Sequence, residues 1–411
     1  MPSACRTVLL LAALGFASPA LADATDQACS TGSAEQRIPA CTKLLDKVLS
    51  KTTRALVLYR RGLAYAGKGD DARAVEDYTA ALALRPRDST TLNARAEAYG
   101  RLSKTAESLA DYAGAIDADK TSALPLINRG FALLDLNRDD DAVQDFNAAI
   151  DLDSRQAEAW KGRGDAYRAL GNQIAALEDY EAALKIDKTY KNAFYGRARS
   201  FIAMKDWGHA LTDLQKSVEL DKEFDSGFFS RAYVRWQLGD TDGAIEDYTK
   251  AIGLVTEFPA ARLERGQLFA SLKRYDQAMA DFDEGVREAP KDDSIFLSRG
   301  TTWRAMGDYE RAISDLSTAI ELKPGSAEAY DERAQTNLLA QRLDAALKDA
   351  DAAVAKDEKV SAYYQTRAAV HEQRGEKEAA IADFKKALEL DADAKTARAG
   401  IARLTGNTKS K

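Results

Sequence analysis

Apolar residues recur along most of the chain at the spacing of amphipathic helices. The block that begins at Ala157 illustrates the pattern. Its second half carries apolar side chains at three- and four-residue intervals, at Ile174, Leu177, Tyr180 and Leu184. Gly171 and Asn172 precede this stretch and predict a break after a first helix that ends near Leu170. The pattern therefore predicts two amphipathic helices in this block.

The same pattern repeats every 34 residues, ten times and without insertion, over residues 55–394. The blocks begin at Ala55, Ser89, Ala123, Ala157, Lys191, Asp225, Pro259, Asp293, Ala327 and Ser361. Position 7 of every block is Arg and position 23 is Asp, while positions 8, 20 and 27 always hold small residues. Single hairpins of such short helices are marginal, so we expect each one to bury its apolar face on the next.

These fixed positions resemble the tetratricopeptide repeat. In the block from Ala157 the family pattern is met by Trp160, Gly164, Tyr167, Ala176, Tyr180 and Ala183. The resemblance implies an all-α fold, a right-handed α–α superhelix of ten 34-residue helix–turn–helix repeats. The blocks from Ser89 and Ala327 depart most from the pattern, at Ser103, Ser108, Asn337 and Ala350, and we expect them to be the least stable.

The invariant Arg and Asp of each block, such as Arg163 and Asp179, have two interpretations. They form a structural ion pair, within one hairpin or between adjacent hairpins, or they form a row of functional charges. Ten identical sites favour the structural pair, because Arg can bind a carboxylate through two N–H groups. The sequence Arg163-Gly164-Asp165 is then part of a helix. It is not predicted to act as an adhesion motif, which needs an exposed flexible loop.

The first 22 residues have the pattern of a secretory signal peptide. An apolar run from Val8 to Phe16 is followed by Ala20-Leu21-Ala22 before Asp23. The run is too short to favour a membrane anchor. We therefore expect an exported protein, periplasmic or secreted.

The segment 23–54 is not a full repeat and is expected to cap the first one. "IPACTKLLDKVLS" predicts a lone second helix, preceded by a loop. Cys29 and Cys41 are the only cysteines left after removal of a signal peptide, and in an exported chain they are expected to pair. Metal binding or redox chemistry is disfavoured, because no CxxC motif or nearby His is present. Residues 395–411 predict a short capping helix, with Ile401 and Leu404 inward, and a disordered tail.

Charge and composition limit the function further. The formal net charge is −7, with 58 basic and 65 acidic residues interspersed, which disfavours nucleic acid and anionic lipid as partners. The two histidines, His209 and His371, lie in different blocks and in no zinc motif. A phosphate-binding loop and a nucleophile motif are also absent from the sequence. We therefore expect no enzyme activity, no metal and no cofactor.

The resemblance implies that positions 2, 5, 9, 12 and 13 line a concave groove. The partner-binding residues predicted in this way are Ile127, Phe131, Tyr195, Arg199, Ile202, Phe229, Tyr233, Trp236, Leu263 and Gln267. Two possibilities stay open: the aromatic residues receive a partner, or they only pack between neighbouring first helices. The carboxylate clamp of some family members is incomplete, since Lys161 is followed by Asp165 and not by Asn.

The sequence thus predicts a non-catalytic scaffold that binds a protein or peptide in its groove, with no stable insertion into a membrane. The alternatives are an accessory subunit of an envelope enzyme or assembly complex, and a self-associating structural protein.

Overall fold

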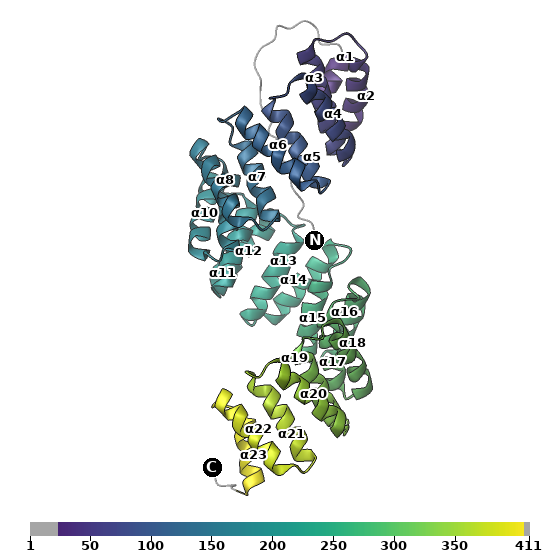
Figure 1. The fold of residues 1–411 in the computed structure, drawn as a ribbon, viewed down its shortest axis with the longest axis vertical. Coiled ribbons are helices and arrows are strands. Elements are labelled where there is room, and N and C mark those ends of the chain that lie inside the picture. Colours follow the sequence, from purple (N-terminus) through teal and green to yellow (C-terminus); the bar gives the residue numbers. More distant parts are fainter. Residues whose placement is uncertain (1–23, 407–411) are drawn as a thin grey trace. The chain divides into compact units, whose positions relative to one another are not determined.

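A computed structural model gives the fold of residues 24–406. The expected signal peptide and the expected disordered tail lie outside these described residues. The described part of the chain is helical and has no strand, which confirms the all-α prediction. It divides into two compact units, one ending at Leu220 and the other beginning at Asp221 (Figure 1).

The N-terminal unit holds a helix pair followed by five repeats. Its helices are α1 (Ala24–Thr31), α2 (Ala34–Leu45), α3 (Lys51–Gly67), α4 (Asp71–Leu84), α5 (Ser89–Arg101), α6 (Thr105–Ala118), α7 (Leu124–Asp135), α8 (Asp139–Leu152), α9 (Ala157–Ala169), α10 (Gln173–Ile186), α11 (Lys191–Ala203) and α12 (Trp207–Leu220).

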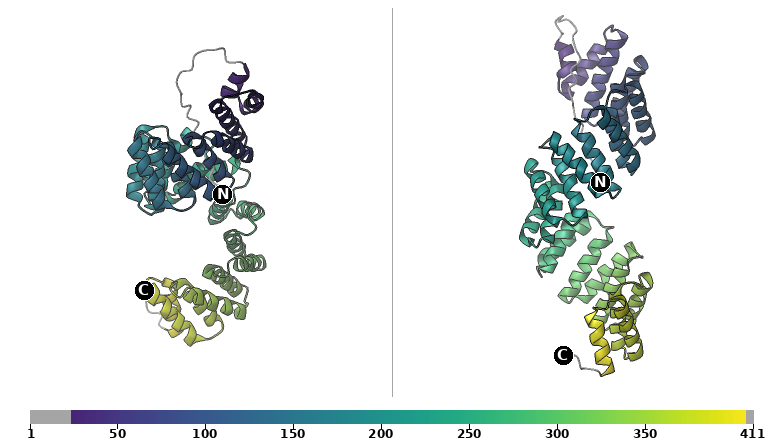
Figure 2. Two further views of the ribbon diagram at one scale, coloured as in Figure 1. Left: turned by 45° about the horizontal axis from the view of Figure 1, so that its top comes forward. Right: turned by 90° about the vertical axis from the view of Figure 1, so that its left-hand side faces the viewer.

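The C-terminal unit holds five further repeats and a last helix. Its helices are α13 (Asp225–Gln237), α14 (Thr241–Leu254), α15 (Pro259–Ser271), α16 (Tyr275–Glu288), α17 (Asp293–Met306), α18 (Tyr309–Leu322), α19 (Ala327–Leu339), α20 (Leu343–Lys356), α21 (Ser361–Gln373), α22 (Lys377–Leu390) and α23 (Lys395–Thr405). Within each unit the first helix of a repeat packs on its second helix, and the second packs on the next first helix (Figure 2).

Each hairpin turn is built from two local signals. Position 15 of every repeat has a positive φ, between 55° and 85°, and is Gly in half of the repeats. The next residue often caps the second helix, as Asn172 does by accepting a hydrogen bond from the backbone N–H of Ala175 at 3.2 Å. The break predicted at Gly171 and Asn172 is confirmed, since α9 ends at Ala169 and α10 begins at Gln173.

In nine of the ten repeats the core contains an aromatic or leucine side chain at position 24; in the repeats from Ala123 and Ala157 this ring is held between glycines of two successive first helices. The ring of Tyr180 on α10 is fully buried. A Cβ atom added to Gly164 of its own repeat would lie 3.0 Å from this ring, and one added to Gly196 of the next repeat 2.5 Å. Burying such a ring stabilises the fold by about 2–3 kcal/mol, and the burial needs both repeats.

The invariant Arg and Asp form the same ion pair in all ten repeats. In each pair Nε and Nη2 of Arg donate to the two carboxylate oxygens of the Asp sixteen residues later, at 2.6–2.9 Å. Arg163 and Asp179 are typical, with side chains 18% and 5% exposed. The pair joins the two helices of one hairpin.

The same guanidinium also reaches the preceding repeat. Its remaining Nη1 donates to the polar side chain at position 25 of that repeat in at least six cases: Arg95–Thr79, Arg163–Asn147, Arg265–Thr249, Arg299–Asp283, Arg333–Ser317 and Arg367–Asp351. One Arg thus links three helices, which explains why Lys, a compact charge without a planar fork, does not appear at this position.

The N-terminal segment differs from the prediction in two respects. The predicted helix over residues 38–50 is α2, which begins earlier, at Ala34, and ends earlier, at Leu45. The residues before Ile38 were expected to form a loop, but residues 24–31 form helix α1, which packs on α2 and α3. The sulfur atoms of Cys29 and Cys41 lie 2.02 Å apart and join α1 to α2. Both cysteines are fully buried in a small cluster with Leu44 and Val57. This packing gives the short α1 a partner, without which eight residues would not stay helical.

At the other end, α23 lies on the last repeat. Ile401 and Leu404 pack against the cluster of Tyr364 and Phe384. Gly400 allows the close approach, since an added Cβ would lie 2.4 Å from the Phe384 ring. The helix therefore covers an apolar surface that in other repeats is covered by the next hairpin.

The Arg–Asp pair gives a direct test of the stack. We expect Asp179→Leu to destabilise α9 and α10 by about 3 kcal/mol, because it leaves the charge of Arg163 half-buried and unpaired. The double variant Arg163→Met/Asp179→Leu should lose less stability than Asp179→Leu alone, because it leaves no buried charge without a partner. Hydrogen exchange of the α9 and α10 amides measures both, and equal losses would contradict this account. Glu181→Gln, on an exposed pair with Lys185, is the matched control and should change stability by less than about 0.5 kcal/mol.

Candidate partner-binding face

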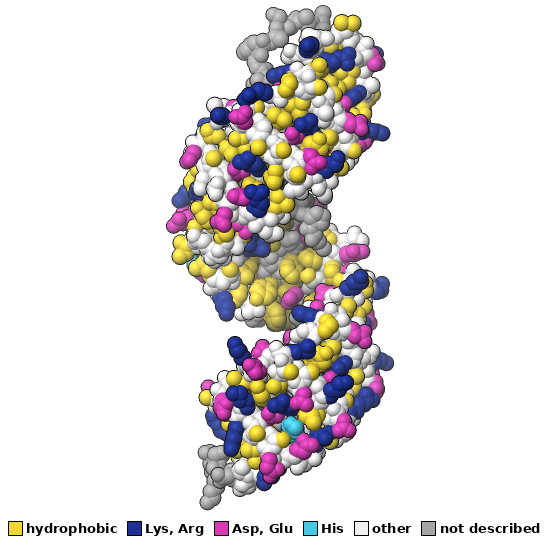
Figure 3. Space-filling view, in the orientation of Figure 1, with side chains coloured by type: hydrophobic (Ala, Val, Ile, Leu, Met, Phe, Trp, Pro, Cys, Tyr) yellow, Lys and Arg dark blue, Asp and Glu magenta, His cyan; other side chains and the backbone are white. Residues whose placement is uncertain are grey.

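In each unit the first helices of the repeats form one face, which we call the first-helix face. In the N-terminal unit it consists of α3, α5, α7, α9 and α11, and in the C-terminal unit of α13, α15, α17, α19 and α21. The residues predicted to bind a partner lie on these helices. Basic, acidic and apolar side chains alternate over the surface shown in Figure 3, without a broad area of one charge.

On α7 the prediction needs a correction. Ile127 was expected to line the groove, but its side chain is only 5% exposed and belongs to the core around Phe146. It is therefore not available to a partner. Phe131 is half-buried, its ring meets the ring of Phe146 edge-on at 5.1 Å, and Lys161 from α9 lies over it.

The residues predicted on α11 are more accessible. Arg199 is exposed, and its guanidinium lies 5.9 Å from the centre of the half-buried Tyr195 ring. Ile202 is also half-buried. These three residues belong to the N-terminal unit, whereas the remaining predicted residues belong to the C-terminal unit.

Three aromatic side chains follow one another along α13. Phe229, Tyr233 and Trp236 occupy positions 5, 9 and 12 of their repeat, a spacing that places them on one side of the helix. Each is half-buried. Phe229 packs against Tyr248 at 5.7 Å and Phe258 at 5.2 Å, measured between ring centres. The aromatic rings thus contribute to the core and also keep part of their surface exposed, and their role as partner contacts stays a prediction.

The predicted residues on α15 contribute mainly to contacts between repeats. Leu263 packs with the core cluster around Phe282. Gln267 donates a hydrogen bond from Nε2 to Oγ of Ser298 on α17, at 2.8 Å. Their role as partner contacts stays a prediction.

A polar cluster on α5 and α7 was not singled out by the sequence. Asn93 and Asn128 both donate to Oε1 of Glu97, at 2.8 and 2.9 Å. Burial raises the pKa of Glu97, against the opposing effects of Arg101 and of the Asn93 hydrogen bond. Burial of the Tyr59 side chain, together with the nearby charge of Glu97, raises the pKa of Tyr59 to about 12. In the sequence the cluster is marked only by polar residues, at positions 5 and 9 of the block from Ser89 and at position 6 of the block from Ala123.

Two carboxyl groups on the C-terminal unit also lack a full set of partners. Asp331 on α19 is 5% exposed; its Oδ2 accepts a hydrogen bond from Gln335 at 2.7 Å, while its Oδ1 has no partner among the described residues. Burial raises the pKa of Asp331 to about 6. Glu264 on α15 is half-buried, and burial raises its pKa too, with no nearby cation to oppose it.

Tyr248 lies beneath the first-helix face close to Glu264. Its side chain is fully buried, and its hydroxyl has no hydrogen-bond partner among the described residues. The equivalent hydroxyl of Tyr180 donates to Oδ1 of Asp165 at 2.7 Å. Asp165 holds position 9 of its repeat, where the repeat of Tyr248 has Tyr233. Burial, followed by the charges of Glu264 and Tyr233, raises the pKa of Tyr248.

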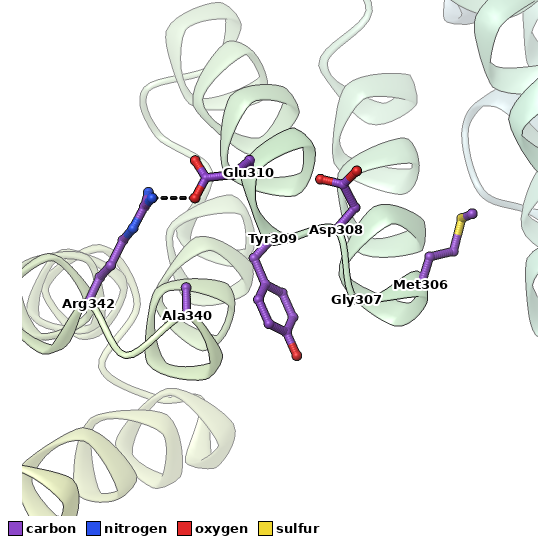
Figure 4. A pocket seen from close by; sticks show the side chains of 7 residues that line it. All are labelled: Met306, Gly307, Asp308, Tyr309, Glu310, Ala340 and Arg342. Atoms are coloured by element: carbon purple, nitrogen blue, oxygen red, sulfur yellow. Dashed lines mark hydrogen bonds and ion pairs between the residues drawn. The ribbon is translucent and has the colours of Figure 1, made fainter.

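Other surface features give no site. A shallow hollow of about 510 Å³ lies at the turns of two repeats, where Glu310 and Arg342 form an ion pair (Figure 4). His371 contacts Glu376 and His209 contacts Asp206, each through Nδ1. Over residues 24–406, no three His, Cys, Asp or Glu side chains come together in a way that could hold a metal ion. Nor is any helix in that range long and apolar enough to cross a membrane.

Asp331 gives a pH-dependent prediction. Because its pKa is about 6 in the folded protein and lower in the unfolded chain, its stabilising contribution is lost as the pH rises from about 4 to about 6. We expect Asp331→Asn to raise stability at pH 7 by about 2 kcal/mol and to leave it unchanged at pH 4. Thermal unfolding at both pH values tests this. Asp349→Asn, which weakens the pair with Arg333, is the control and should lower the stability of the protein at pH 7. If Asp331→Asn raised the stability equally at pH 4 and pH 7, the prediction would be contradicted.

Comparison with known proteins agrees with this geometry. Tetratricopeptide repeat models match residues 55–88, 157–190, 229–293, 297–361 and 361–393. No curated protein matches the chain. Among solved structures, a tetratricopeptide repeat protein from Parabacteroides merdae is 21% identical, with a TM-score of 0.51, over 61% of this chain and 99% of that one.

Two larger structures cover more of the chain at lower similarity. The Cut9–Hcn1 hetero-tetramer of the APC/C is 15% identical over 90% of this chain and 93% of that one, with a TM-score of 0.47. Yeast Tom70 is 16% identical over 91% of this chain and 92% of that one, with a TM-score of 0.45. The family models, matched over more than half of the sequence, and the hairpins of both units show that the chain belongs to the tetratricopeptide repeat family.

Proposed function

We propose that this protein is a non-catalytic scaffold that binds a protein or peptide on its first-helix face, with the main contact on the C-terminal unit. The observation that carries the proposal is the row of Phe229, Tyr233 and Trp236 along α13, each with an exposed part on one side of the helix. Half-buried aromatic side chains are rigid and are the commonest anchors in protein interfaces. Membership of a family of protein-interaction scaffolds supports the same role.

The regularity of the chain supports a binding role over an enzymatic one. Within residues 24–406 every helix belongs to a repeat or packs on a terminal repeat, so the described part has no separate catalytic domain. The side chains with unusual environments are distributed along the first helices and not gathered into one cleft. This arrangement suits the recognition of an extended partner.

Removing the aromatic row tests the proposal. We expect Phe229→Ala/Tyr233→Ala/Trp236→Ala to reduce partner capture at least tenfold, because each exposed aromatic anchor contributes about 1–2 kcal/mol to binding. The measurement is affinity purification from the cells that express the protein, with identification by mass spectrometry. Leu238→Ala/Leu272→Ala removes two exposed apolar side chains at the hairpin ends and is the matched control. Unchanged capture by the triple variant, with its helicity intact, would refute the assignment of this face.

We also propose that the protein is exported, to the periplasm or outside the cell. The signal-peptide pattern of residues 1–22 and the buried pair of Cys29 and Cys41 support this location. The mature protein is expected to begin at Asp23 and to have no thiol that reacts before reduction. N-terminal sequencing and thiol titration of protein purified from its source measure both; a retained Met1 would contradict export by this route.

A further inference from the structure

We propose that the first-helix face at α13 and α15 binds an arginine side chain of the partner. The site consists of Phe229, Tyr233 and Trp236 on α13 and Glu264 on α15. The inference rests on the proposed function, since it names the chemical group that this face recognises.

The chain itself contains an example of the proposed contact. Glu332 on α19 and Glu264 on α15 both occupy position 6 of their repeats. Glu332 forms an ion pair with Nη2 of Arg304, which stands at position 12 of the preceding first helix, α17. The equivalent position before Glu264 holds Trp236. The carboxylate at α15 therefore lacks the guanidinium that its counterpart at α19 has, and an aromatic ring takes the place of the arginine.

A cation from a partner would stabilise the charged form of Glu264. Its side chain is half-buried and has no hydrogen bond or ion pair with any of the described residues. A partner that covered this carboxylate with apolar groups would leave a buried, unpaired charge, which is strongly unfavourable. A cationic group on the partner removes that penalty.

The neighbouring side chains favour arginine over lysine. A guanidinium binds a carboxylate through two parallel N–H groups and stacks flat on aromatic rings, which an ammonium group does not. Trp236, which holds the position of Arg304 opposite the carboxylate, supplies aromatic surface beside it.

Tyr248 lies buried in the core cluster against which Phe229 and Trp236 pack. Its side chain is fully buried and its hydroxyl has no partner among the described residues. In the repeat from Ala157, the equivalent hydroxyl of Tyr180 is directed to position 9 of its own first helix. The hydroxyl of Tyr248 is thus expected to point toward Tyr233, on the same face as the aromatic row.

Peptide pools separate the charge of arginine from its shape. The probes are immobilised decapeptides, randomised except for a central arginine, citrulline or lysine; citrulline has nearly the shape of arginine and no charge. Purified full-length protein should be retained about tenfold better by the arginine pool than by the citrulline pool, and better than by the lysine pool. Equal retention by arginine and citrulline, or by arginine and lysine, would overturn the proposal.

Two variants at the same repeat position complete the test. Glu264→Gln keeps the shape of the side chain and should reduce the preference for arginine over citrulline to less than about twofold. Glu332→Gln is the matched control and should keep the preference, because that carboxylate already binds Arg304. Circular dichroism confirms that both variants are folded. A full arginine preference in Glu264→Gln would also overturn the proposal.

The outcome is distinguishable from that of the proposed function. If the triple alanine variant on α13 loses its cellular partner while the pools show no arginine preference, this inference fails and the binding role stands. If the triple variant keeps its partner, the binding role of this face fails, whatever the pools show.

Discussion

The structure depends on a large side chain that no single hairpin can bury. In seven of the ten repeats the second helix presents an aromatic ring at position 24, and the rings of Phe146 and Tyr180 fit only between glycines of their own first helix and of the next one. A hairpin alone covers one side of the ring, so its stability comes from its neighbour. At the C-terminal end α23 covers the ring of Phe384, and at the N-terminal end the α1–α2 pair covers Val57 of α3.

The ten Arg–Asp pairs secure the geometry that this packing needs. Each pair is largely buried and joins the two helices of a hairpin, and in at least six repeats the same guanidinium also binds the preceding repeat. A bidentate pair fixes the relative position of two helices more narrowly than apolar contact does. Because these interior contacts are constant, the outward positions of the first helices are free to differ from repeat to repeat. The differences are where function is to be sought, and the exchange of Arg304 for Trp236 opposite equivalent glutamates is one of them.

Much of the fold was predictable because its rules are local and repeated ten times. The break at Gly171 needs a left-handed residue, and the helix faces follow from the spacing of apolar residues such as Leu177 and Leu184. The error before Ile38 has a physical cause as well. Helix α1 is too short to signal itself in the sequence and is helical because it packs on α2 and α3.

The candidate site was only partly predictable, because exposure depends on neighbours that the sequence does not place. Ile127 and Phe229 hold the same repeat position, yet Ile127 is buried in the core around Phe146 while Phe229 stays half-exposed. The sequence by itself determined the repeat, its two helices and the identity of the paired charges, since each follows from spacing along the chain. Only the tertiary structure decided that Glu264 lacks a partner while Glu332 has one, because that depends on which side chain of the preceding helix lies across from each carboxylate.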